Sequence, residues 1–84
     1  MHIVYIIDFI QVTEVVNLSE QYFLKKCITT AEDAKGSYSM MAHLEGIDQE
    51  AKQTYDNMLN DIGQHLHYLS NRLRYLEQHN KSGD

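Results

Sequence analysis

Histidine and acidic side chains in the C-terminal third are the residues best suited to metal or acid–base chemistry. His65 and His67 are separated by one residue. On a helix, residues two apart point about 200° apart, so this pair cannot share a metal ion. Asp61 and His65 lie four apart and could share one, but no third or fourth ligand follows at a set spacing. We therefore expect solvated polar faces and no metal site.

Cys27 is the single cysteine, and it follows Lys25 and Lys26. Neighbouring cations can activate a thiol, but a lone cysteine without an assigned histidine is more often a small packed apolar residue. One cysteine allows neither an intramolecular disulfide nor a cysteine-based zinc site, and it fits a reducing cytoplasm. The chain contains no G-x-S-x-G, Walker or dinucleotide-binding glycine motif. We expect no enzyme and no cofactor.

The tyrosines suggest recognition. Tyr68 and Tyr75 lie seven residues apart, and together with Arg72 and Arg74 they form an aromatic and cationic strip. Tyr and Arg are frequent anchors of protein interfaces, and they also stack on and pair with anionic ligands. Ordinary amphipathic side chains are the plain alternative. We predict that this strip binds a macromolecular partner or a small anionic, nucleotide-like ligand.

A heptad repeat must position these side chains. Apolar residues recur at steps of 4, 3, 4, 3, 4 and 3. A helix with such a stripe needs a partner, because the stripe cannot be left in water. This heptad seam consists of Tyr55, Leu59, Ile62, Leu66, Leu69, Leu73 and Leu76.

The seam belongs to one long helix, predicted from about 49 to about 78. Asp48 is a suitable N-cap. Acidic residues lie in the first half of the helix and arginines in the second, an order that suits the helix dipole. Residues 80–84 are predicted to be a flexible polar tail.

Shorter helices are predicted before it. Ser19 can cap a helix over residues 20–28. Thr29 with Glu32 forms a capping-box pattern, which opens a second short helix that Gly46 ends.

The first segment leaves two alternatives open. Residues 2–16 are rich in β-branched side chains, which favours a strand. A lone strand has no partner in the chain, so it would pair across a subunit interface, or tertiary packing would make the segment helical. In both cases we expect its isoleucines to be buried. They are Ile3, Ile6, Ile7 and Ile10.

Composition narrows the classes of function. Twelve acidic against seven basic side chains give a net charge of −5 over 84 residues. This balance argues against nucleic-acid binding and against anionic membrane surfaces. Asp8 interrupts the first apolar run, so no signal peptide or membrane span is expected. We predict one all-α domain over 1–84, a small bundle in which the long C-terminal helix packs on shorter helices.

Charge placement predicts how the long helix associates. In an antiparallel pair, Asp56 and Asp61 of one chain approach Arg72 and Arg74 of the other. A parallel pair would place like charges side by side, so we favour antiparallel pairing. The alternative is that the seam packs inside one subunit, and both arrangements can hold together.

These features predict a small non-enzymatic interaction protein that forms a helical homo-oligomer in the cytoplasm. It would bind, inhibit or escort a macromolecular partner. Phage-encoded inhibitors, antitoxins and secretion chaperones share this size and class, which is an analogy and not a residue match. The runner-up is an oligomer that sequesters a nucleotide-like ligand in pockets between subunits. An acidic mimic of nucleic acid ranks third.

Overall fold

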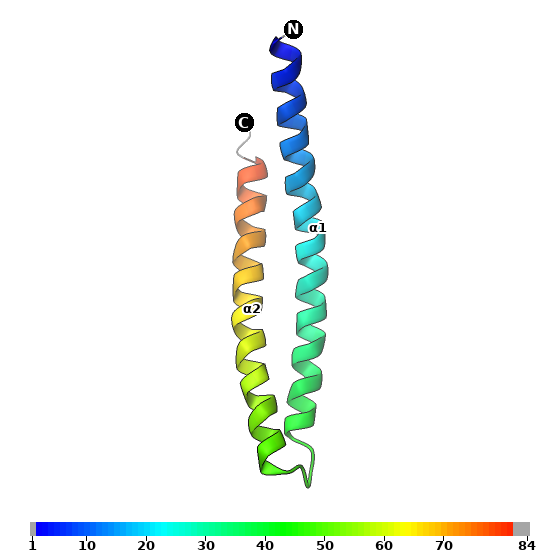
Figure 1. Cartoon of the computed structure of the whole chain (residues 1–84), viewed down its shortest axis with the longest axis vertical. Helices are drawn as coiled ribbons and strands as arrows, with labels where there is room; N and C mark the ends of the chain where they lie inside the picture. The colour runs from blue at the N-terminus through cyan, green and yellow to red at the C-terminus, as the bar shows by residue number, and fades with distance from the viewer. Residues whose placement is uncertain (1, 82–84) are drawn as a thin grey trace.

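The chain forms two antiparallel helices in the computed structural model (Figure 1). The structure describes the backbone of residues 2–81 and the side chains of residues 11–79. α1 spans His2–Ala42 and α2 spans Gln49–Lys81. The molecule is a slender hairpin that measures 70 × 15 × 15 Å.

The all-α prediction is confirmed, since both elements of residues 2–81 are helices. Residues 2–16 are helical in their backbone, which excludes the inter-subunit strand. Extending a helix that already exists needs no new nucleation, so a modest β-preference is overridden. The expected burial of Ile3, Ile6, Ile7 and Ile10 concerns side chains that lie outside the described residues.

The predicted short helices over 20–28 and 30–45 are wrong, because α1 is one helix of 41 residues. Ser19 and Thr29 lie inside this helix and do not begin new ones. The hydroxyl of Thr29 donates a hydrogen bond to the carbonyl of Lys25 at 3.1 Å. This bond to the preceding turn lets a threonine sit in a helix interior, so a capping-type residue alone does not mark a boundary.

The connection turns at Gly46, but α1 has already ended at Ala42. The amide of Ile47 donates to the carbonyl of Leu44 at 3.2 Å, which closes a tight turn. Gly46 has φ of +83° at the third position of that turn. This left-handed conformation suits glycine, as in a type II turn. Gly46 therefore reverses the chain without capping the helix.

Asp48 begins α2 as predicted. Its Oδ1 accepts hydrogen bonds from the amides of Glu50 at 2.8 Å and Ala51 at 3.2 Å. These bonds satisfy amides that have no partner within the helix. α2 then continues to Lys81, beyond the predicted end near residue 78. Residues 80 and 81 of the predicted tail belong to α2, and residues 82–84 lie outside the described residues.

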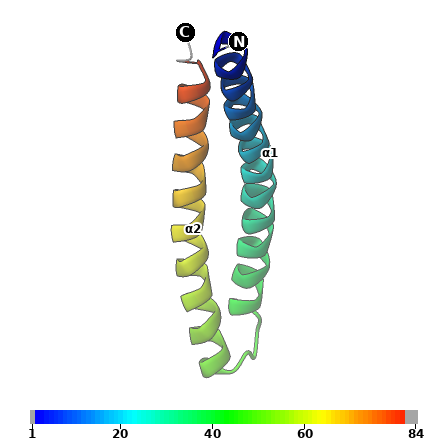
Figure 2. The ribbon, with the colours of Figure 1, turned by 45° about the horizontal axis from the view of Figure 1, so that its top comes forward.

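α1 extends past the end of α2. Tyr38 stacks on Tyr55 near the loop, with ring centroids 6.2 Å apart. Asn17 contacts Leu76 far from the loop. In this register the last turn of α2 lies beside the region of α1 near residue 12, and the start of α1 continues beyond it (Figure 1). A view turned by 45° also shows the helices side by side (Figure 2).

The core between two helices is thin. The buried hydrophobic residues among the described side chains are Leu24, Ala42 and Leu76, and no large side chain there is fully buried. The chain exposes 6814 Å², whereas a compact protein of this mass exposes about 5,200 Å². Within residues 2–81, neither helix combines the length and apolarity needed to cross a bilayer. The hairpin thus leaves much apolar surface in contact with water.

Candidate interaction surfaces

The heptad seam of α2 faces α1 within the same chain. Leu76 is buried, and the other six seam residues are half-buried. α1 meets the seam with its own heptad row, which we call the inner row and which was not predicted. It consists of Asn17, Gln21, Leu24, Ile28, Ala31, Tyr38 and Ala42. The seam therefore serves the internal contact of the hairpin, one of the two uses that its sequence left open.

Two amides lie in the inner row and explain why it was missed. Gln21 is only 8% exposed, and its Nε2 donates to Oδ1 of Asn17 at 2.6 Å. Asn17 Nδ2 in turn donates to the carbonyl of Leu76 at 3.3 Å. Buried polar groups of this kind need their partners and so favour one alignment of two helices. The pair links α1 to the last turns of α2.

A bidentate ion pair crosses between the helices beside these amides. Arg72 Nε lies 2.7 Å from Glu20 Oε2, and Arg72 Nη2 lies 3.0 Å from Glu20 Oε1. The hydrogen bonds from Arg72 lower the pKa of Glu20 from its ordinary 4.5, although partial burial opposes this effect. The pKa of Arg72 is raised for the same reason. Fork-to-fork pairing adds directional specificity to the contact.

The ion pair with Glu20 sets Arg72 apart from the other three residues of the predicted strip. Arg72 is engaged by Glu20, and its guanidinium also lies 5.4 Å from the ring centre of Tyr75. Tyr75 stacks on His79 at 3.8 Å, and Tyr68 is 65% exposed. Arg74 is exposed and precedes Tyr75 by one residue, about 100° around the helix, so it borders the strip from the other side. The structure leaves Tyr68, Tyr75 and Arg74 accessible, and their binding role stays a prediction.

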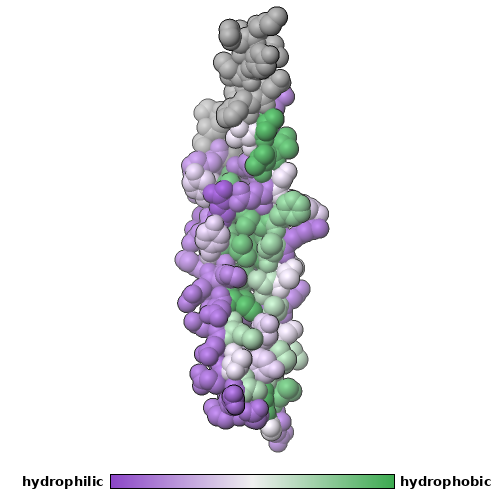
Figure 3. All heavy atoms as spheres, in the orientation of Figure 1, coloured by the Kyte–Doolittle hydropathy of each residue, from purple (hydrophilic) through white to green (hydrophobic). Residues whose placement is uncertain are grey.

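A larger apolar surface lies on α1, where sequence reasoning placed no interaction site. Its first described turns expose six large hydrophobic side chains, each between 52% and 61%. They are Val12, Val15, Val16, Leu18, Tyr22 and Phe23. Figure 3 shows hydrophobic residues gathered in a band along one face of the hairpin, with hydrophilic residues along the α2 edge. The sequence signal was the excess of apolar residues around α1, more than one contact with α2 can cover.

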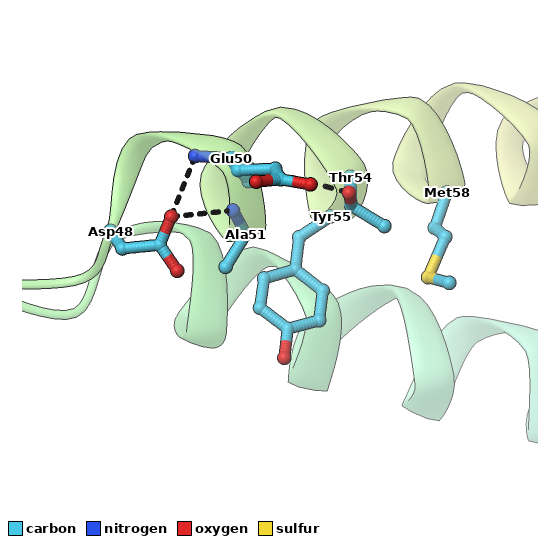
Figure 4. A pocket seen from close by; sticks show the side chains of 6 residues that line it. All are labelled: Asp48, Glu50, Ala51, Thr54, Tyr55 and Met58. Atoms are coloured by element: carbon cyan, nitrogen blue, oxygen red, sulfur yellow. Dashed lines mark hydrogen bonds between the residues drawn. The ribbon is translucent and has the colours of Figure 1, made fainter.

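A shallow hollow lies at the start of α2 (Figure 4). Its volume is about 450 Å³, and Tyr55 points from α2 toward α1 beside it. Asp48 caps the helix there, and the Thr54 hydroxyl donates to the carbonyl of Glu50 at 3.0 Å. These polar groups stabilise the beginning of α2, so we assign the hollow a structural role.

The residues considered for chemistry lie on the surface. Asp61, His65, His67 and Cys27 are all exposed. His67 shares a hydrogen bond of 3.1 Å with Asn71. Among the described residues, no three His, Cys, Asp or Glu side chains are placed to hold a metal ion. The apolar and aromatic surfaces are therefore the candidates for interaction among the described residues.

Comparison with protein families, curated proteins and solved structures finds no match to this chain. The functional assignment rests on the surfaces described above.

Proposed function

We propose that this chain is a small non-enzymatic interaction protein that forms a helical homo-oligomer and binds, inhibits or escorts a macromolecular partner. The exposed apolar surface of the hairpin carries the proposal. Soluble proteins rarely leave contiguous apolar patches in water unless the patch binds something. Here Val16 is 59% and Phe23 is 61% exposed, next to a core that holds no large fully buried side chain among the described residues.

The partner site proposed is the strip of Tyr68, Arg72, Arg74 and Tyr75. Two exposed tyrosines and an exposed arginine support it, because such side chains supply contact area at low entropic cost. Arg72 orients the ring of Tyr75 from its ion pair with Glu20. The role of Arg72 is thus to hold the strip in place.

We place the protein in the cytoplasm, and the single unpaired Cys27 supports this assignment. Phage-type inhibitors, antitoxins and secretion chaperones remain the analogous classes by size and charge. The formal charge of −5 favours a protein partner over nucleic acid.

One observation favours the ligand-sequestering alternative. A shallow hollow of about 550 Å³ on α1 is lined by Tyr22, Lys25, Lys26, Thr29 and Thr30. The Lys26 ammonium lies 4.8 Å from the ring centre of Tyr22. One helix covers just one side of a ligand, so tight binding would need a second subunit. A rise in thermal midpoint with added nucleotide would support this alternative.

Native mass spectrometry of the protein purified from its own source tests the proposal. We expect a multiple of the 9.8 kDa chain mass, together with any bound partner. A bare 9.8 kDa species at the concentrations found in the cell would contradict self-association.

Alanine variants test the partner site once the partner has been captured. Tyr68→Ala, Arg74→Ala or Tyr75→Ala should weaken binding by about 1 kcal/mol or more at one position at least, as anchor residues do. Gln64→Ala changes an exposed residue of the same helix and is the matched control. If the three folded variants bind like the parent, the strip is not the partner site.

A further inference from the structure

We propose that one lateral face of the hairpin binds a second copy of the chain in antiparallel order. The product is a four-helix bundle in which the loop end of each copy lies beside the open end of the other. This inference rests on the proposed self-association and specifies the face, the occupant and the direction.

The face begins with a second heptad row on α1, directly beside the inner row. Its apolar members are Val12, Val16, Phe23, Cys27, Ala34 and Met41. The polar residues Glu20, Thr30 and Ser37 occupy the remaining positions of this lateral row. A helix with two adjacent apolar rows is typical of bundles, where each helix contacts two neighbours. α2 occupies one row, and the lateral row is left without a neighbour.

α2 completes the same face. Glu20 lies in the lateral row between Val16 and Phe23, and its ion pair with Arg72 marks the edge of α2 that borders this row. One turn before Arg72 is the half-buried Leu69, and Met58 lies further along that edge with 38% exposure. The lateral face therefore carries apolar groups from α1 and, on α2, Leu69 and Met58 beside the polar Arg72.

The α2 side of the opposite face is polar. The edge of α2 away from Arg72 carries small or charged residues in heptad spacing. They are Asp56, Gly63, Ser70 and Glu77. The adjoining edge of α1 is mixed, because Lys25, Glu32 and the apolar Leu18 are all exposed there. Apolar residues therefore line both helices on the lateral face, whereas the opposite face has them on α1 alone. This difference favours a closed pair through the lateral face over a growing chain.

The available area suits a stable dimer. Each hairpin exposes 6814 Å², and a compact protein of twice this mass exposes about 8,600 Å² in total. Two hairpins that reached that compactness would bury roughly 5,000 Å², at the upper end of obligate homodimer interfaces. Half of that area would still be sufficient.

Charge determines the direction. The loop half, residues 30–62, carries seven acidic side chains against two lysines, a net charge of −5. The open half, residues 11–29 and 63–79, carries three acidic side chains against four basic ones, a net charge of +1. Parallel pairing would bring the two acidic halves together. Antiparallel pairing brings each acidic half beside the cationic half of the other copy, and complementarity of this kind fixes orientation more than affinity.

The antiparallel arrangement predicts which residues meet. Cys27 stands near the middle of the stretch of α1 that runs beside α2, and Val12 and Met41 lie near its two ends. A two-fold axis beside Cys27 places Val12 of one copy close to Met41 of the other. It keeps the two Val12 residues, and likewise the two Met41 residues, roughly 40–45 Å apart at 1.5 Å per helical residue.

Crosslinking tests the direction. Val12→Cys and Met41→Cys, each combined with Cys27→Ser, are refolded separately and as a mixture, and then treated with a short bis-maleimide. The mixture should form crosslinked dimers on the order of a hundredfold faster than either variant alone, because thiols held across an interface react at a high effective concentration. Glu14→Cys with Met40→Cys is the control pair, at similar heights on other sides of α1, and should not crosslink.

A charge on the face provides a second readout. Phe23 is 61% exposed within one hairpin, so Phe23→Asp should keep the hairpin helical. It should weaken the dimer roughly 30-fold or more, as loss of a central aromatic anchor does. Met40→Asp, at a residue that is 74% exposed and off the face, should leave the dimer intact.

The outcomes separate the two proposals. A dimer by mass that lacks the mixed crosslink and tolerates Phe23→Asp would overturn this face and direction while self-association stands. Self-crosslinking of Val12→Cys alone would also overturn the antiparallel order. A monomer by mass would overturn the proposed self-association itself.

Discussion

Single polar residues determine how the two helices align. Glu20 and Arg72 are 52 positions apart in the chain, and Asn17 reaches the carbonyl of Leu76 across a still longer separation. Neither contact could be predicted from the sequence, because periodicity shows which face a residue occupies and not which distant residue it meets. Gln21 was missed for a related reason, since an amide interrupts the apolar pattern that reveals a buried row.

The ion pair predicts a pH dependence of stability. Arg72 lowers the pKa of Glu20 in the folded chain below 4.5. The unfolded state therefore binds the proton first as the pH falls. The contribution of the pair is fully present above the ordinary carboxyl pKa and is lost as the pH falls through the lowered pKa of folded Glu20. Glu20→Gln should be less stable than the parent at pH 7, and the difference should be smaller at pH 3. Urea unfolding at both pH values measures this.

Glu14→Gln is the control for that experiment. It makes the same chemical change on α1, outside the pair with Arg72. Its stability should follow that of the parent at both pH values. If Glu20→Gln also follows the parent at pH 7, the pair does not contribute to stability.

The two helices differ in how well the sequence predicts them. α2 was predicted closely because a regular heptad seam, an Asp48 cap and its charge order all agree. α1 was divided wrongly because Ser19 and Thr29 are typical caps, whereas its hydrophobic residues lie on more than one face. Its continuity follows from packing against α2 and from propagation of an existing helix, which local residue preferences do not show.

Two glycines should respond in opposite directions to the same substitution. Gly46 has φ of +83°, so Gly46→Ala forces a side chain into the left-handed region at a cost of about 1–2 kcal/mol. Gly36 lies inside α1, and an added methyl group meets no atom within 4 Å there. Gly36→Ala should stabilise the chain by about 0.5–1 kcal/mol. Thermal unfolding by circular dichroism compares them, and equal midpoints would contradict the turn geometry.

At the scale of the whole molecule, the sequence predicted that a stripe needed a partner but not where the partner would be. The structure uses the heptad seam inside the chain, and yet six of its seven residues remain half-exposed. Of the exposed apolar residues of α1, Val12, Val16 and Phe23 lie in the lateral row, which the sequence could not orient without knowing which side α2 covers. The strip of Tyr68, Arg72, Arg74 and Tyr75 was predicted by residue type; all but Arg72 are exposed, and its binding role stays a prediction.

The seam predicts how the whole fold responds to a central charge. Leu66 is half-buried in the middle of the α1–α2 contact. Leu66→Asp places a carboxylate there at a cost of several kcal/mol, which should unfold the hairpin or dissociate its assembly. Gln64→Asp introduces the same group at an exposed position of α2 and should change little. Circular dichroism and mass measurement check both variants, and an unchanged Leu66→Asp protein would contradict the packing described here.

The slender outline of the hairpin, 70 Å long and 15 Å across, governs how it moves through solvent. A rod experiences more friction than a sphere of equal mass, so a lone hairpin leaves a sizing column early and imitates a heavier protein. Lateral pairing doubles the mass while adding little length, and the friction per unit mass falls. Column elution therefore hardly separates the two species. The sedimentation coefficient separates them well, because it increases with the ratio of mass to friction, and pairing doubles the mass while raising the friction by much less.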